Sequence, residues 1–134
     1  MGFHQTTLDP YGCVVTLVTD KRAWAKVKRV LPGLVDGNPY PAGDGWTMHS
    51  NWAPKNGRRV QHFVVVIRPD RQGSISDLLD TCAHEAVYIT GSVMRRIGHR
   101  PKDIGFDEPW AYQVGWLTAW LWERAKEAYD AQAA

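Results

Sequence analysis

The sequence predicts an α+β domain in which a small, mostly antiparallel sheet packs on helices in the order β-α-β-β-α-α. Three observations support this class. Residues 13–18 form a continuous apolar and β-branched run, residues 46–52 alternate between two faces, and the C-terminal part carries two long stretches of helical periodicity. A length of 134 residues is enough for one core, so we expect a single domain over residues 1–134.

The first half of the chain begins with a strand that the run at 13–18 predicts to be buried on both faces. Thr19 or Asp20 can cap the helix that follows, from Lys21 to about Leu31. Pro32-Gly33 ends this helix, and the stretch 32–45 is rich in Gly and Pro and is predicted to be a long loop.

A hairpin is predicted next. Residues 46–52 place Trp46 and Met48 on one side and Thr47 and His49 on the other, which is strand spacing. Asn56-Gly57 is typical of a tight hairpin turn, and residues 59–67 form the return strand.

Two helices complete the chain. Ser74 or Ser76 can cap the first, which we expect over residues 77–97, and the second is expected over residues 108–128. At 100° per residue, His84 and Tyr88 lie opposite the apolar stripe of the first helix, and Glu85 lies about a quarter turn away. His84 and Tyr88 should therefore face solvent or a cleft.

Composition excludes some classes of function. A net charge of +2 gives no reason to expect a nucleic-acid partner, and no apolar run is long enough to span a membrane. We also expect no secretion through a conventional signal. Cys13 and Cys82 are predicted to be buried free thiols, which fits a reducing compartment.

Residues 84–88 read His-Glu-Ala-Val-Tyr, one residue away from the zinc-hydrolase signature H-E-x-x-H. In the complete signature two histidines one helical turn apart bind zinc, and the Glu between them activates water. Here Tyr88 occupies the second His position. Glu108 opens the next helix, where the third ligand of such a site would lie.

The last helix is apolar on almost every side, which predicts burial. Tyr112, Trp116 and Trp120 form one of its stripes, among polar residues. Either the rest of the domain covers this stripe, or its aromatic residues are anchors for a protein partner or for self-association. Gly115 and Ala119 would let a second helix approach closely.

The motif and the layout resemble a known family. His84-Glu85-Ala86-Val87, with Glu108 and then Ala111-Tyr112 downstream, resembles the small gluzincin-type (minigluzincin-type) zincin-like domains encoded by tailed bacteriophages. Those proteins read H-E-A-V-H and carry a Glu shortly before Ala-Tyr, and the specific part of the resemblance covers residues 80–122. The resemblance implies a zincin-like fold and a protein of the host cytoplasm or the virion.

The resemblance also implies roles for individual residues. His84 would be the first zinc ligand and Glu108 the third, and Glu85 would be the catalytic base if a metal is bound. Tyr88 departs from the pattern and leaves two of the three protein ligands that a catalytic zinc normally keeps. Tyr88 itself, as a phenolate, or His49 could supply the missing ligand.

His62 and His99 are further candidates for that ligand. The alternative that we favour has no metal, and the imidazole, the phenol and the downstream carboxylate hydrogen-bond to one another between the helices. We therefore expect no cofactor, with zinc as the alternative. A basic run at Arg95-Arg96 and 99–102 could meet phosphate or an acidic partner, or could be a solvated helix end.

Two functional hypotheses follow. The one we favour is a phage-encoded zincin-like domain with an altered metal site, non-catalytic, which acts as a structural or host-interaction protein through its last helix. The alternative is an active zinc-dependent peptidase that uses His84, Glu85 and Glu108. In that case the strand at 46–52 would pair with an extended peptide.

Overall fold

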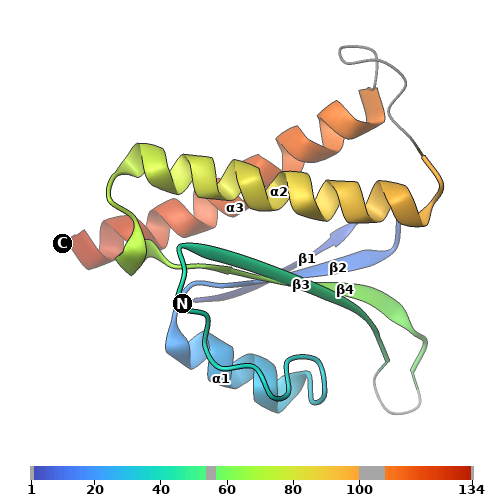
Figure 1. Ribbon diagram of the computed structural model, residues 1–134, viewed down its shortest axis with the longest axis horizontal. Coiled ribbons are helices and arrows are strands. Elements are labelled where there is room, and N and C mark those ends of the chain that lie inside the picture. Colours follow the sequence, from blue (N-terminus) through green and yellow to red (C-terminus); the bar gives the residue numbers. More distant parts are fainter. Residues whose placement is uncertain (1, 54–56, 100–107, 134) are drawn as a thin grey trace.

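The computed structural model describes residues 2–53, 57–99 and 108–133. Figure 1 shows a sheet between helices: α1 (Lys21–Val30) covers one face, and α2 (Ile75–Arg96) and α3 (Glu108–Ala133) lie over the other. In the described part of the chain the sheet has four strands, which are β1 (Phe3–Leu8), β2 (Cys13–Val18), β3 (Gly45–Trp52) and β4 (Val60–Ile67). The predicted α+β class is confirmed.

The sheet is mixed, with strand order β1-β2-β4-β3. The two outer pairings are antiparallel, and the central pairing of β2 with β4 is parallel. A parallel pairing needs a crossover connection, and here α1, the following loop and β3 provide it. In consequence β3 becomes an edge strand of the described sheet, with Thr47 opposite Val65 on β4.

The strand β1 was not predicted. Its sequence, Phe-His-Gln-Thr-Thr-Leu, contains too few apolar residues to give a strand signal, because as an edge strand it buries little beyond Leu8. It pairs with β2 along its whole length, from Phe3 opposite Val18 to Leu8 opposite Cys13. The turn between them contains Gly12 at φ 68°, a conformation that favours glycine. The observed order is therefore β-β-α-β-β-α-α.

Alternate residues of the central strands feed two apolar cores, one on each face of the sheet. Phe63 and Val65 point toward α2 and α3, whereas Val64 and Val66 point toward α1. The predicted long loop contributes Leu34 and Val35 to the core on the α1 side, so this loop also covers part of the sheet.

The predicted helix limits differ slightly from the observed ones. The Asp20 carboxylate accepts a hydrogen bond of 2.7 Å from the backbone N–H of Ala23, so Asp20 caps α1 as expected. Ser74 caps α2, which begins two residues earlier than predicted, and α3 extends to Ala133. The predicted turn at Asn56-Gly57 lies partly outside the described residues.

Candidate functional site

The helix α2 holds the His-Glu-Ala-Val-Tyr segment in its middle. The Ser74 hydroxyl oxygen accepts a hydrogen bond of 3.1 Å from the backbone N–H of Asp77, and Asp77 adds a negative charge to the first turn. At the other end Gly98 adopts φ 77°, and the backbone N–H of His99 donates to the carbonyl of Met94 at 2.9 Å. Residues 84–88 therefore belong to a helix that is capped at both ends.

His84 and Tyr88 lie together on the outer face of α2, as the helical spacing predicted. Their ring centroids are 4.9 Å apart with an interplanar angle of 55°. The Tyr88 side chain is 59% exposed, and His84 is exposed as well. The pair forms a surface contact one helical turn in length.

Glu85 points to a different place, between α2 and β3. It is only 5% exposed, and its Oε2 accepts a hydrogen bond from the Thr47 hydroxyl. Burial raises the pKa of Glu85, while the Thr47 hydrogen bond and the nearby His84 act in the opposite direction. The carboxyl group thus joins helix and edge strand beneath the surface that carries the two rings.

Gly45 makes this close approach of β3 to α2 possible. A Cβ atom added at Gly45 would lie 2.7 Å from Cγ2 of Thr81 and 2.9 Å from Oε1 of Glu85. The Thr81 methyl is fixed in turn, because the Thr81 hydroxyl donates to Oε1 of Gln72 at 3.1 Å. Any side chain at position 45 would push the edge strand away from Glu85.

Glu108 is the first residue of α3 and is exposed. It lines a hollow of about 380 Å³ that otherwise consists of α3 residues. Trp110, two residues later, packs near Gly91, where an added Cβ would be 3.4 Å from the indole ring. Gly91 is seven residues beyond His84, which is about 10 Å along the helix axis.

Figure 1 shows α3 crossing α2 in the opposite direction, with its first turns rising away at the C-terminal end of α2. Glu108 therefore lies toward that end of α2. Among the described residues, no group of three or more His, Cys, Asp or Glu side chains could hold a metal ion. Of the residues that the resemblance implies as ligands, the described contacts bring together His84 and Tyr88.

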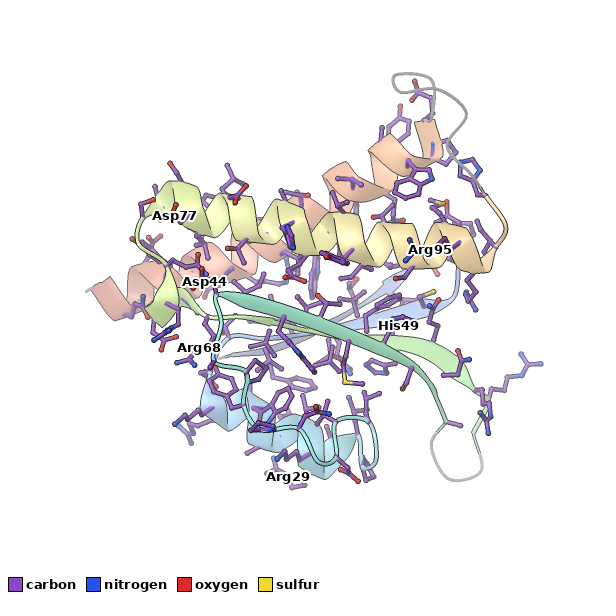
Figure 2. All side chains as sticks on the ribbon, in the orientation of Figure 1. Arg29, Asp44, His49, Arg68, Asp77 and Arg95 are labelled. Atoms are coloured by element: carbon purple, nitrogen blue, oxygen red, sulfur yellow. The ribbon has the colours of Figure 1, made fainter. Side chains whose placement is uncertain are left out.

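The other histidines occupy separate environments. The His49 ring packs on Phe63 with centroids 5.4 Å apart, and His49 lines a hollow with Arg95 and Arg96. Figure 2 shows His49 on β3 and Arg95 on α2 at the same end of the molecule. His62 faces the α1 side of the sheet, where it shares a hydrogen bond of 2.8 Å with the Thr16 hydroxyl.

Burial of His62, which is 3% exposed, lowers its pKa to about 4. The sheet separates it from α2. His99 lies just beyond the C-terminal end of α2, so the last turns of the helix separate it from residues 84–88. Cys82 lies in the core as predicted, and burial raises the pKa of its thiol to about 12, which disfavours the reactive thiolate form.

The three aromatic residues predicted as a binding stripe on α3 have different environments. Tyr112 is 74% exposed and Trp116 is 48% exposed. Trp120 is buried in the core between sheet and helices, with the Arg124 guanidinium 4.5 Å from its ring. Trp120 is therefore not an exposed anchor, because α3 turns this position toward the sheet.

Sequence reasoning missed the partners of Glu85. Thr47 and Gly45 lie on a strand whose alternation the sequence shows. The alternation puts Thr47 on the face away from Trp46, and in the structure that face is turned toward α2. A glycine directly before an alternating run was the available signal for a close approach of backbone to a neighbour.

No family model, no curated protein and no solved structure matches the chain. In the part of the chain that the structure describes, no helix is both long and apolar enough to cross a bilayer.

Proposed function

We propose that this chain is a non-catalytic protein-binding domain that docks through the outer face of α3, with a second copy of the chain as its partner. The observation that carries the proposal is the pair Tyr112 and Trp116. They lie one helical turn apart, and both remain exposed on a helix whose opposite side is buried. Aromatic side chains of this kind are frequent anchors in protein interfaces.

The surface around the two rings supports docking of a helix. A hollow of about 380 Å³ lies on one side of the rings, where Ala111 and Gly115 leave the helix surface low. On the other side, a hollow of about 450 Å³ separates Tyr112 and Trp116 from the β1–β2 hairpin, near Leu8. The face thus presents an aromatic ridge beside a shallow groove.

A ridge and a groove on one helix make this surface self-complementary. In a two-fold dimer, each Tyr112–Trp116 ridge would occupy the groove at Ala111 and Gly115 of the other copy. This arrangement is the basis for choosing a second copy as the occupant. The kinship that we propose is the one implied by the resemblance, a zincin-like domain of phage origin acting in the host cytoplasm or the virion.

The positions of the motif residues support binding over catalysis. A hydrolytic base must be within hydrogen-bond reach of the water that it activates. Glu85 is instead buried against β3 and engaged by Thr47, while the two aromatic rings of His84 and Tyr88 lie at the surface. A carboxylate in that position links two elements of the fold.

Light scattering after size-exclusion chromatography, over a series of concentrations, tests the proposal. The wild type should show dimers that dissociate on dilution, and Tyr112→Asp should be monomeric throughout. Tyr88→Asp is the matched control, because it places the same charge on another exposed tyrosine, 59% exposed on α2. A wild type that stays monomeric at high concentration, or dissociation by both variants alike, would refute docking through α3.

The peptidase hypothesis has one observation in its favour: β3 is an edge strand and lies directly beside Glu85. An extended peptide could add to that edge by main-chain hydrogen bonds. Elemental analysis of protein purified without chelator separates the two functions. Stoichiometric zinc that disappears in His84→Ala would favour the peptidase and count against the non-catalytic domain.

A further inference from the structure

A hollow of about 480 Å³ lies at the C-terminal end of α2, where the helix passes the β3–β4 pair. Its side chains come from three elements, and all of them can donate hydrogen bonds. Six of these donors are His49, Asn51, Gln61, Ser92, Arg95 and Arg96. No carboxylate is among its lining residues.

The two arginines in the hollow have donors to spare. Among the described residues, the Arg95 guanidinium makes one hydrogen bond, a long one of 3.4 Å to the Ser92 hydroxyl. Arg96 uses one nitrogen, Nη2, which donates to the Tyr11 carbonyl at 2.7 Å and to Sγ of Cys13 at 3.3 Å. Within the described residues, neither guanidinium has a carboxylate at ion-pair distance.

Arg96 is held by two contacts, whereas one long hydrogen bond is found for Arg95 within the described residues. The bond from Arg96 to the Tyr11 carbonyl reaches across to the β1–β2 turn and holds the guanidinium in one place. Arg95 is exposed and precedes it by one residue, so both side chains can bend toward the hollow. Pre-orientation of one cation lowers the entropy cost of binding an anion.

The polar residues around the arginines suit a phosphate. Arginine forks bind phosphate oxygens by paired, charge-assisted hydrogen bonds. The Ser92 hydroxyl, the side-chain amides of Asn51 and Gln61 and an N–H of the His49 ring add neutral donors. Gln61 is 5% exposed, and its Oε1 already accepts from the Cys13 thiol, which leaves its amide N–H groups for a ligand.

The end of α2 opposes an anion only weakly. A helix C-terminus carries about half a negative charge, and here the N–H groups of Ile97, Gly98 and His99 bond to the last carbonyls. Two full positive charges on Arg95 and Arg96 outweigh that effect. The volume of the hollow is within the range of small-molecule sites and leaves room for more than one oxyanion.

We propose that this hollow binds the phosphate group of a small phosphorylated organic molecule between Arg95 and Arg96. The site is separate from the α3 face and does not depend on how the chain associates. Its loss would leave the Tyr112–Trp116 surface unchanged.

Titration of the full chain with inorganic phosphate, followed by two-dimensional NMR at constant ionic strength, tests the site. Saturable shifts should centre on His49, Ser92 and the Nε–H signals of both arginines. Arg95→Gln should weaken binding about tenfold or more, the expected effect of losing hydrogen bonds from a charged group. Arg95→Lys keeps the charge but loses the paired N–H donors of the guanidinium, so its affinity for phosphate should lie between that of wild type and that of Arg95→Gln.

Arg29→Gln is the matched control, since it removes the same charge from α1 on the opposite side of the sheet (Figure 2). Its affinity for phosphate should stay within about twofold of wild type, the change expected from a distant screened charge. Absence of saturable shifts, or equal weakening by Arg29→Gln and Arg95→Gln, would overturn the proposal. Phenyl phosphate should bind more tightly than inorganic phosphate, and weaker binding would contradict an organic ligand.

Discussion

The contact between β3 and α2 gives the sharpest test of the structure, through the substitution Gly45→Ala. The added methyl would lie 2.7 Å from the Thr81 methyl carbon, where ordinary carbon contacts are about 3.5–4.0 Å. It would also lie 2.9 Å from Oε1 of the buried Glu85. A helical threonine has few rotamers to escape into, so the strand itself must move.

The cost should resemble that of overpacking a core, about 1–3 kcal/mol. A chain of 134 residues has an unfolding entropy of about 0.28 kcal/mol/K at the usual value per residue, so the melting temperature should fall by about 4–11 °C. Replacing glycine by alanine also restricts the unfolded chain, which offsets about 0.4–1 kcal/mol of the loss and makes the fall in melting temperature about 1–4 °C smaller.

Gly43→Ala is the matched control for this loss. Its added methyl would meet only the Gly45 carbonyl oxygen, at 3.8 Å, which is an ordinary contact. Gly43→Ala should therefore be as stable as wild type or slightly more stable. Differential scanning calorimetry on both variants measures the difference.

A second substitution identifies the atom responsible. Thr81→Ser removes the methyl that Gly45→Ala would strike and keeps the hydroxyl that donates to Gln72. In the double variant, part of the Gly45→Ala loss should disappear, which a double-mutant cycle reports as coupling. Equal melting temperatures for Gly45→Ala and Gly43→Ala, or additive effects in the cycle, would show that β3 does not lie against α2 at this point.

Three further predictions concern the buried groups and the α3 face. Burial raises the pKa of Glu85, so its contribution to stability is fully present below the unfolded pKa near 4.3 and is lost as pH rises through the folded pKa. In urea titrations, the free energy of unfolding of Glu85→Gln should therefore rise relative to that of wild type as the pH increases over this range. A difference that does not change with pH would contradict a buried acid. Burial lowers the pKa of His62 from 6.5 to about 4, so its contribution to stability is present above pH 6.5 and falls by about 3 kcal/mol toward pH 4. His62→Gln should remove that part of the loss of stability in acid. A plot of the free energy of unfolding against pH that runs parallel to that of wild type would refute this. Trp120→Ala should cost about 3–5 kcal/mol because the ring is in the core, whereas Trp116→Ala should change stability by about 1 kcal/mol or less; similar losses in denaturant unfolding would mean that both rings are buried.

Local patterns in the sequence predicted most of the fold. The run at 13–18, the alternation at 46–52 and both long helices appear where expected, because their apolar periodicity reports which face is buried. The strand β1 has no such pattern, because it buries almost none of its side chains. It is held in the sheet by its backbone pairing with β2. The parallel pairing of β2 with β4 depends on the crossover, which no local signal encodes.

The candidate site was predictable only as far as one helix extends. Helical spacing placed His84 beside Tyr88, and their rings are in contact. The direction of Glu85 depends on Gly45, which lies forty residues earlier in the chain and joins it only through the sheet. Likewise, periodicity grouped Trp116 with Trp120, but the angle at which α3 crosses the sheet decides that Trp120 is covered.

The parallel pairing at the centre of the sheet has a consequence for synthesis on the ribosome. β2 ends at Val18, but its partner β4 is complete only at Ile67. At about 5–20 residues per second, an emerging chain would carry the apolar β2 without that partner for about 2–10 s. During this interval β1 can cover one edge of β2, while the other edge stays unpaired until β4 is complete, and an unpaired strand edge is prone to aggregation.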